Sequence, residues 1–166
     1  MVSLEEEIRQ EVYDALMGVK DPEIDTVSII DLGMVEKVNV EGNNVNIVLL
    51  PTFLGCPALE IIKKNTVNAV KRLPSVGEVE VEFVFHPPWT SERITEEGHK
   101  GLRAFGIAPP PQHFEVDGSW HVDCPYCGST YVTMENIFGP TACRSILYCK
   151  SCKNPFEAMK PVSTIM

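Results

Sequence analysis

Four cysteines late in the chain have the spacing of a metal-binding ribbon. They form two Cys-x-x-Cys pairs, Cys124 with Cys127 and Cys149 with Cys152. Each two-residue spacing lets both sulfurs of a pair reach one tetrahedral ion at about 2.3 Å, and the separation of the two pairs is typical of two zinc knuckles. Four thiolates leave no open coordination position, so we predict a structural rather than a catalytic zinc ion. A ribbon of this size needs its metal in order to fold.

A fifth cysteine complicates this site. Cys143 lies shortly before Cys149 and offers another thiol to a site that needs four ligands. Three interpretations remain open: a spare ligand, a buried thiol without metal, or a ligand in an alternative site such as an iron–sulfur cluster, which also uses four cysteines. The sequence therefore leaves open the choice between zinc and iron, and which four of the five late cysteines bind the ion.

The remaining cysteine, Cys56, lies between an apolar run that ends at Pro51 and a second run with helical periodicity. Strand, loop and helix is the simplest interpretation. Pro57 suits the first helical position, which makes Cys56 the expected N-cap, among free backbone N–H groups at the positive end of the helix dipole. Such a position favours the thiolate, which attacks electrophiles or binds soft metals. The alternative is a small buried residue with an inert thiol.

A catalytic thiol at this position would need a base. The candidates are His86, at the end of a predicted strand, and Asp21 or Glu23 in an acidic loop. Nothing in the spacing brings these groups to Cys56, so the sequence establishes no catalytic dyad. A Cys–His hydrolase is kept as an alternative, and a protein that is not an enzyme is favoured.

Length and charge restrict the function classes. The chain has 166 residues, 44% of them hydrophobic, and a formal net charge of −9, which is unfavourable for non-specific binding to nucleic acid or to an anionic membrane. The charge is uneven, because residues 121–166 carry a net +1 and the first 120 residues −10. We see no secretory signal and no apolar run of the roughly 18 residues that cross a bilayer. We expect a cytoplasmic protein whose cysteines bind metal rather than form disulfides.

The hydrophobic pattern predicts an α+β fold that contains both helices and strands. A capped helix is followed by an acidic loop, a hairpin, a second helix after Cys56, a strand with alternating glutamates, and a third helix. A run of three prolines then predicts an extended linker that cannot join a sheet. The expected domains are an N-terminal domain at 1–105, a linker at 106–120 and the four-cysteine zinc ribbon at 121–166.

Two blocks of the first half resemble a known family. Asp21-Pro-Glu-Ile24 is followed by the block SIIDLGMV at 28–35 and by Thr52-Phe-Leu-Gly-Cys-Pro57, a combination similar to the domain of iron–sulfur assembly factors such as SufT and the cytosolic targeting proteins of eukaryotes. The resemblance implies a small α/β sandwich, a three-stranded mixed sheet with helices, in which the cysteine matching Cys56 is the functional residue. It also makes Thr52 and Glu23, from the same blocks, candidates for metal or cluster transfer.

Further motifs resemble a more specific family. Pro87-Pro-Trp-Thr90, Gly101-Leu-Arg103, Gly106-Ile-Ala-Pro-Pro110 and the stretches CPYCGS and FGPTACRSILYCKSC are similar to the PaaD (PaaJ) family of phenylacetate-degradation proteins, which are encoded with phenylacetyl-CoA epoxidase. This resemblance covers nearly the whole chain and includes the cysteine matching Cys143. It implies an accessory protein that matures the iron–sulfur or di-iron centre of the oxygenase or reductase components of that monooxygenase.

Several functions compete with this one. The chain could be a structural subunit of the oxygenase complex with an inert Cys56, or a general iron–sulfur assembly factor for another client. If Cys56 handles iron or a transient cluster, one thiolate cannot hold it alone, so a homodimer, the client or a small thiol must complete the ligands. We therefore expect a homodimer across the Cys56 face. Binding of nucleic acid by the ribbon is the weakest alternative, because the net charge there is only +1.

Overall fold

The computed structural model describes residues 2–52, 58–110, 122–140 and 144–160. The chain divides into two compact units, Met1–Trp89 and Thr90–Met166. This division differs from the expected boundary at residue 105, because the third helix packs within the second unit. Each unit is described by itself below.

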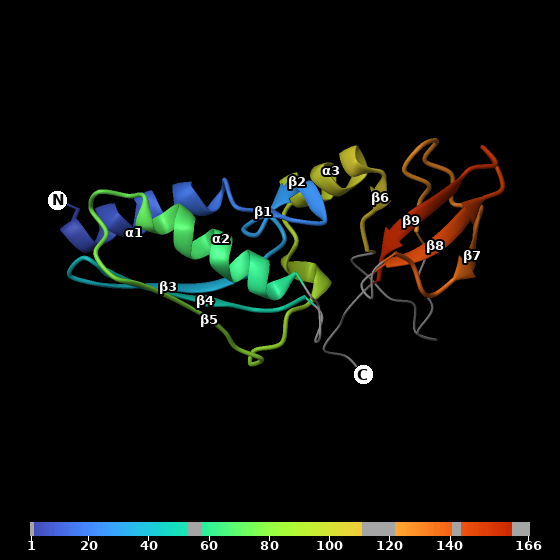
Figure 1. Ribbon diagram of the computed structural model, residues 1–166. Coiled ribbons are helices and arrows are strands. Elements are labelled where there is room, and N and C mark those ends of the chain that lie inside the picture. The colour runs from blue at the N-terminus through green and yellow to red at the C-terminus, as the bar shows by residue number, and fades with distance from the viewer. Residues whose placement is uncertain (1, 53–57, 111–121, 141–143, 161–166) are drawn as a thin grey trace. The chain divides into compact units, whose positions relative to one another are not determined.

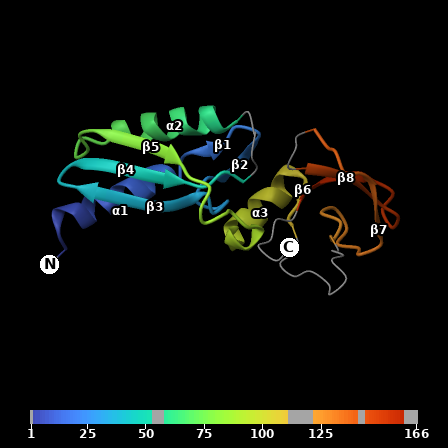
Figure 2. The ribbon, with the colours of Figure 1, turned by 90° about the horizontal axis from the view of Figure 1, so that it is seen from below.

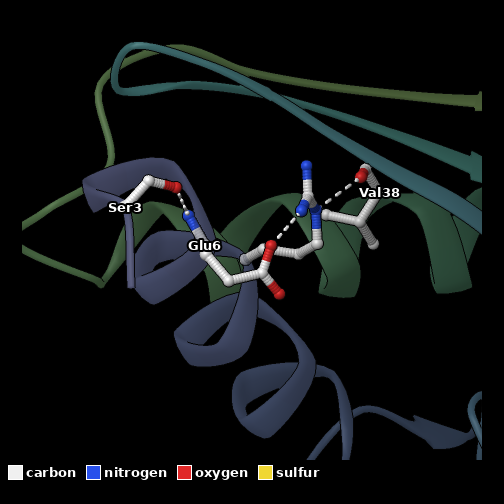
Figure 3. A network of polar contacts seen from close by, with 4 residues as sticks. Ser3, Glu6 and Val38 are labelled. Carbon is white, nitrogen blue, oxygen red and sulfur yellow. Dashed lines mark hydrogen bonds and ion pairs between the residues drawn. The ribbon is translucent and has the colours of Figure 1, made fainter. Parts of the chain in front are cut away.

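The first unit begins with helix α1, Leu4–Leu16. The hydroxyl of Ser3 accepts a hydrogen bond from the Glu6 N–H at 3.2 Å, as the capping pattern predicts. Arg9 forms an ion pair with Glu6, and its Nε donates to the Val38 carbonyl at 3.3 Å, which ties the exposed side of the helix to the sheet (Figure 3). Leu4, the first residue of α1, is 65% exposed, whereas Ile8, one turn later, is buried.

A small hairpin replaces the expected acidic loop. Strand β1, Lys20–Asp21, pairs antiparallel with β2, Ile24–Ser28. Pro22 stands in the turn between them, where its missing N–H removes no ladder bond. The turn is closed locally, because the Asp21 carboxylate accepts the Glu23 N–H at 2.8 Å. Residues 29–33 form a turn that leads to the next strand.

The expected three-stranded mixed sheet is confirmed. Strand β3, Val35–Glu41, pairs antiparallel with β4, Asn44–Leu49, which pairs parallel with β5, Val79–Phe83. The parallel pair requires a crossover, which helix α2, Leu59–Lys71, provides. Figures 1 and 2 show α1 and α2 on the same face of this sheet. The core lies between the helices and the sheet and includes the following buried residues: Ile8, Val12, Leu16, Val38, Ile47, Leu49, Ile62, Val70 and Val81.

Helix α2 begins later than the sequence predicts. Its N-cap is Ala58, whose backbone is already helical and whose side chain offers no acceptor, so the expectation of Cys56 as the N-cap is wrong. The hydrogen bond from Ile62 N–H to the Ala58 carbonyl, 2.9 Å long, defines the first turn. Proline is accepted at several positions near the start of a helix, so its position alone does not identify the first helical residue. Residues 53–57, which include Cys56, lie outside the described residues.

The second unit contains a 3₁₀ turn at Ser91–Arg93, helix α3 at Glu96–Phe105, and a four-stranded sheet with the order β6-β9-β8-β7. In chain order its strands are β6 Ile107–Ala108, β7 Val132–Asn136, β8 Arg144–Cys149 and β9 Pro155–Met159. Strand β6 pairs parallel with β9. It belongs to the segment expected to be a linker outside any sheet, and that expectation is wrong because two apolar residues precede the prolines and are buried.

Buried Arg144 connects α3 to this sheet within the second unit. Its guanidinium lies 5.9 Å from the centre of the Phe105 ring and donates to the Glu157 carboxylate at 2.7 Å. A guanidinium that both stacks on a ring and pairs with a carboxylate is held in one orientation. Phe105 is partly exposed, whereas Ile94 and Leu102 are buried. Among the described residues, no helix is both long and apolar enough to cross a membrane.

Candidate functional site

The two Cys-x-x-Cys pairs come together in the second unit. Ligand atoms of Cys124, Cys127, Cys149 and Cys152 all lie within 4.8 Å of one another. The sulfurs of Cys124 and Cys152 are 3.7 Å apart, and those of Cys127 and Cys149 are 3.6 Å apart. A tetrahedral ion with metal–sulfur bonds of about 2.3 Å places its sulfurs roughly 3.8 Å apart. The donor set and its spacing therefore fit a tetrahedral zinc ion.

Both cysteine pairs lie in turns of the same form. In the first turn the Gly128 N–H donates to the Cys124 carbonyl at 2.9 Å, and in the second the Lys153 N–H donates to the Cys149 carbonyl at 2.8 Å. The residue that closes each turn has positive φ, 74° at Gly128 and 61° at Lys153. Glycine adopts this conformation without cost, but lysine does not. A glycine after a cysteine pair is a recognisable turn signal in the sequence, as at Gly128. Lys153 gives no such signal.

The thiols of this site differ in acidity. Backbone N–H groups of Cys152 and Ser151 and two neighbouring thiols lower the pKa of Cys149 to about 6, against the opposing effect of burial. The Cys152 N–H lies 3.5 Å from the Cys149 sulfur. At Cys127 the Ser129 N–H lowers the pKa, but burial and three neighbouring thiols raise it, to about 11. In the folded geometry Cys149 is therefore the more acidic of these two thiols.

The four thiols predict how metal binding depends on pH. A zinc ligand must be a thiolate, so binding displaces the protons that the thiols still carry, and affinity falls as the pH falls. Because the ribbon needs its metal in order to fold, the metal-free cysteines lie in an unfolded segment, where a thiol has a pKa of about 8.5 and is mostly protonated at pH 7. We therefore expect close to four protons to be released per zinc ion at pH 7. Calorimetric titration of metal-free protein with zinc in buffers of different ionisation enthalpy measures this number, and release of two protons or fewer at pH 7 would contradict the prediction.

The other two residues considered for this site lie outside the described residues. Cys143 is one of them, so its three interpretations stay open. His121, which precedes the first pair, is the other. The described residues provide four cysteines for the cluster, which is a complete set for a tetrahedral ion.

At the N-terminal unit, several loops converge where the parallel strands β4 and β5 end. The Leu50 N–H donates to the Met34 carbonyl at 2.7 Å, and the buried Trp89 indole donates to the Leu32 carbonyl at 2.7 Å. Thr52 is half-buried and follows this junction directly. The carboxyl ends of parallel strands are where open α/β sheets bind ligands. The chain continues toward Cys56 from this end of the sheet.

Glu23 and Asp31 lie in closed turns of this unit. Glu23 is half-buried in the β1–β2 turn, with its N–H bound to Asp21. The Ser28 hydroxyl is 3.1 Å from both the carboxylate and the N–H of Asp31, which closes the turn after β2. His86, the base considered for a thiol enzyme, is exposed just beyond β5. Whether any of these groups approaches Cys56 depends on residues outside the described part, so a role for Glu23 and Thr52 in transfer stays a prediction.

Two structural residues have little signal in the sequence. Trp89, the last residue of its unit, bridges the end of β5 to the turn after β2 through its indole hydrogen bond. His99 is buried on α3, and burial, followed by the nearby Arg103, lowers its pKa while Glu96 raises it. The imidazole is therefore neutral at pH 7. The spacing of Ile94 and Leu102 around His99 was the only signal for its inward position.

Two family models match the chain, and each matches a part that contains one of the two groups of cysteines. Residues 9–82 match the iron–sulfur cluster assembly protein family. Residues 108–160 match the PaaD zinc beta ribbon domain. The first range contains Cys56 and the second contains all four cysteines of the cluster.

Curated relatives match either the whole chain or its first half. A protein from Escherichia coli, named as a putative subunit of 1,2-phenylacetyl-CoA epoxidase, is 35% identical over 159 residues, covering 90% of this chain and 91% of that protein. The Fe–S protein maturation auxiliary factor YitW from Bacillus subtilis is 34% identical and covers 55% of this chain and 90% of its own length. SufT from Staphylococcus aureus, another such factor, is 35% identical and covers 46% of this chain and 88% of its own length.

Solved structures share the fold of the first unit. A domain of unknown function, DUF59, from Bacillus anthracis gives a TM-score of 0.55 at 34% identity, covering 59% of this chain and 93% of that one. A conserved hypothetical protein from Thermotoga maritima gives 0.50 at 33% identity, covering 60% and 94%. The chain joins an iron–sulfur assembly domain to the PaaD type of zinc ribbon, and a relative matches it over nine-tenths of its length. This chain therefore belongs to the PaaD family.

Proposed function

We propose that this protein matures the iron–sulfur or di-iron centre of a multicomponent phenylacetyl-CoA monooxygenase, and that it is an accessory factor rather than a catalytic subunit. The observation that carries the proposal is that two similarities occur in one chain. The half that contains Cys56 matches maturation factors, and the whole chain matches a protein named as an epoxidase subunit.

In this proposal Cys56 is the thiolate that receives iron or a cluster as cargo and passes it to the client. Thr52 and Glu23 assist at the same end of the sheet, Thr52 beside the departing loop and Glu23 in the β1–β2 turn. The hydrogen bonds from Leu50 to Met34 and from Trp89 to Leu32 support a fixed base for that loop. A cluster needs further ligands, so transfer takes place in a homodimer joined across the Cys56 face or in the complex with the client.

The ribbon has a different role in this proposal. Its four cysteines hold one zinc ion, which stabilises the C-terminal sheet and takes no part in transfer. The burial of Cys124 and Cys149 in the small core of the ribbon supports this assignment. A closed four-thiolate zinc site has neither redox chemistry nor an open position.

The test compares wild-type protein with Cys56→Ala, both purified without air. We expect wild type to load iron into metal-free oxygenase or reductase component, and Cys56→Ala to lose most of that loading while it keeps about one zinc ion per chain. Iron and acid-labile sulfide in the client are measured after separation from the factor. Asn65→Ala, at an exposed site on α2 of the same unit, is the control. Full client loading by a strictly monomeric Cys56→Ala protein would contradict the proposal.

A second candidate is a structural component of the oxygenase complex, which the similarity to a protein named as an epoxidase subunit favours. It predicts a stable, stoichiometric complex with the mature oxygenase that survives Cys56→Ala. A maturation factor should instead bind the metal-free component and dissociate once the metal is loaded. Size-exclusion chromatography with mature and metal-free components separates the two.

A further inference from the structure

The free edge of the ribbon sheet exposes an unusual set of side chains. Strand β7 is the last strand in the sheet order, and within the described residues it pairs only with β8. Large apolar side chains lie exposed along this strand and at both its ends, with Tyr131 62% and Phe138 72% exposed and Met134 and Ile137 exposed between them. Exposed apolar groups that occur together in this way mark interaction sites, whereas single ones do not.

Two lysines accompany the aromatic rings at the ends of this edge. The Lys150 ammonium lies 5.0 Å from the centre of the Tyr131 ring, and the Lys160 ammonium lies 5.2 Å from that of Phe138. Both distances are within the range of a cation–π contact. Each contact holds a positive charge beside an exposed apolar surface. The aromatic–lysine edge, defined by Tyr131, Met134, Ile137, Phe138, Lys150 and Lys160, is therefore both apolar and cationic.

The charge of this edge contrasts with the rest of the protein. The first 120 residues carry a net charge of −10, and the part from residue 121 carries +1. Within the ribbon, Arg144 pairs with Glu157, so that cation is already neutralised. Glu135 is the acid on the edge strand itself, and its carboxylate accepts a hydrogen bond from the Thr133 hydroxyl at 3.1 Å. An acidic partner would be repelled by most of this molecule and attracted at this edge.

The form of the strand indicates how a partner would bind. The register of β7 against β8 shifts between Met134 and Asn136, and such an irregularity interrupts the regular ladder. Addition of a long strand is therefore disfavoured there. The side chains of the edge would make most of the contacts, with the rings as apolar anchors and the lysines as partners for carboxylates.

We infer that the aromatic–lysine edge is the docking surface for the client, and that it binds a segment of the client protein in which carboxylates flank apolar side chains. This inference rests on the proposed function, because it names the surface by which the ribbon engages the protein to be loaded. It separates the work of the two units: the ribbon binds the client, and the N-terminal unit transfers the cargo.

The test uses the metal-free oxygenase and reductase components as probes and measures binding by biolayer interferometry at low and high salt. The variants are the double change Lys150→Glu with Lys160→Glu, and the single change Phe138→Ser. Lys37→Glu with Lys71→Glu is the matched control, since it changes the net charge equally at exposed sites of the first unit. Leu4→Ser is the control for loss of one exposed apolar side chain. Zinc content and the far-UV spectrum of every variant establish that the ribbon is intact.

We expect wild type to bind one component and to bind it more weakly at high salt. Both edge variants should bind at least about tenfold more weakly, as expected when an anchoring side chain of an interface is removed, and both controls should bind like wild type. Edge variants that bind like wild type, while Cys56→Ala loses client loading, would overturn the docking surface and leave the proposed function standing. Wild type that binds neither component would overturn both.

Discussion

Cys149→Ser should reduce the zinc content from about one ion per chain to near zero and unfold the sheet of the second unit. Cys149 is fully buried, belongs to the core of the ribbon, and lies 3.6 Å from the Cys127 sulfur. Binding of a structural zinc ion supplies about 10–16 kcal/mol to domains of this kind, far more than so small a core could replace. The readouts are zinc content by atomic emission and the loss of protected amides in β8 and β9 by hydrogen exchange.

Two further variants make this result specific. Ser151→Ala lies in the same turn and keeps the backbone N–H that acts on Cys149, so it should keep the zinc ion and the protected amides. Cys143→Ser tests the fifth cysteine. If Cys143→Ser loses the metal and Cys149→Ser keeps it, the four clustered cysteines are not the ligand set.

Trp89→Ala should destabilise the N-terminal unit by about 3–5 kcal/mol, the usual cost of truncating a large buried aromatic side chain. The indole is buried and donates to the Leu32 carbonyl, so truncation creates a cavity and also leaves that carbonyl without its donor. Urea unfolding of zinc-loaded protein, followed by far-UV circular dichroism, measures the effect. The helices of the first unit dominate that signal.

Trp89→Phe separates the two contributions. The ring fills most of the space but donates no hydrogen bond, so the loss should be about 1–3 kcal/mol, the cost of one buried polar group left unsatisfied. Phe85→Ala is the matched control, because Phe85 lies shortly before Trp89 and is exposed, and it should change stability by less than about 0.5 kcal/mol. Equal effects of Phe85→Ala and Trp89→Ala would show that Trp89 is not a core residue.

The features that sequence predicted well are those determined by neighbouring residues. The Ser3 cap depends on a hydroxyl and an N–H three residues apart. The alternation of valines and glutamates at 78–83 produces β5, with Val81 buried and Glu80 and Glu82 exposed. The Cys-x-x-Cys pairs likewise depend on short spacing, and the four cysteines indeed come together.

The features that sequence missed depend on contacts between distant segments. Leu4, the first residue of α1, has the helical spacing of the buried Ile8 but is 65% exposed. The inward position of Trp89 depends on the carbonyl of Leu32, far away in the chain. No local pattern encodes that pairing. The start of α2 at Ala58 was missed because a proline marks the region of a helix start and not its first hydrogen bond.

The boundary between the units was missed for a related reason. Helix α3 follows the N-terminal domain in sequence without a break in composition, so the sequence predicts that it belongs to that domain. The stacking of Arg144 on Phe105 instead attaches α3 to the ribbon sheet. Periodicity and proline content describe neighbouring residues. They therefore do not reveal a contact between Phe105 and the buried Arg144, which is distant along the chain.

Strand β6 has a consequence for how such a chain can arise by gene fusion. Ile107 and Ala108 are buried and pair with β9, so the ribbon sheet is completed by residues that precede the cysteines and the proline run. A recombination that transferred only the stretch from the first cysteine onward would leave the edge of β9 open and uncover its core. The inheritable module is therefore longer than its metal-binding motif, and it begins no later than β6.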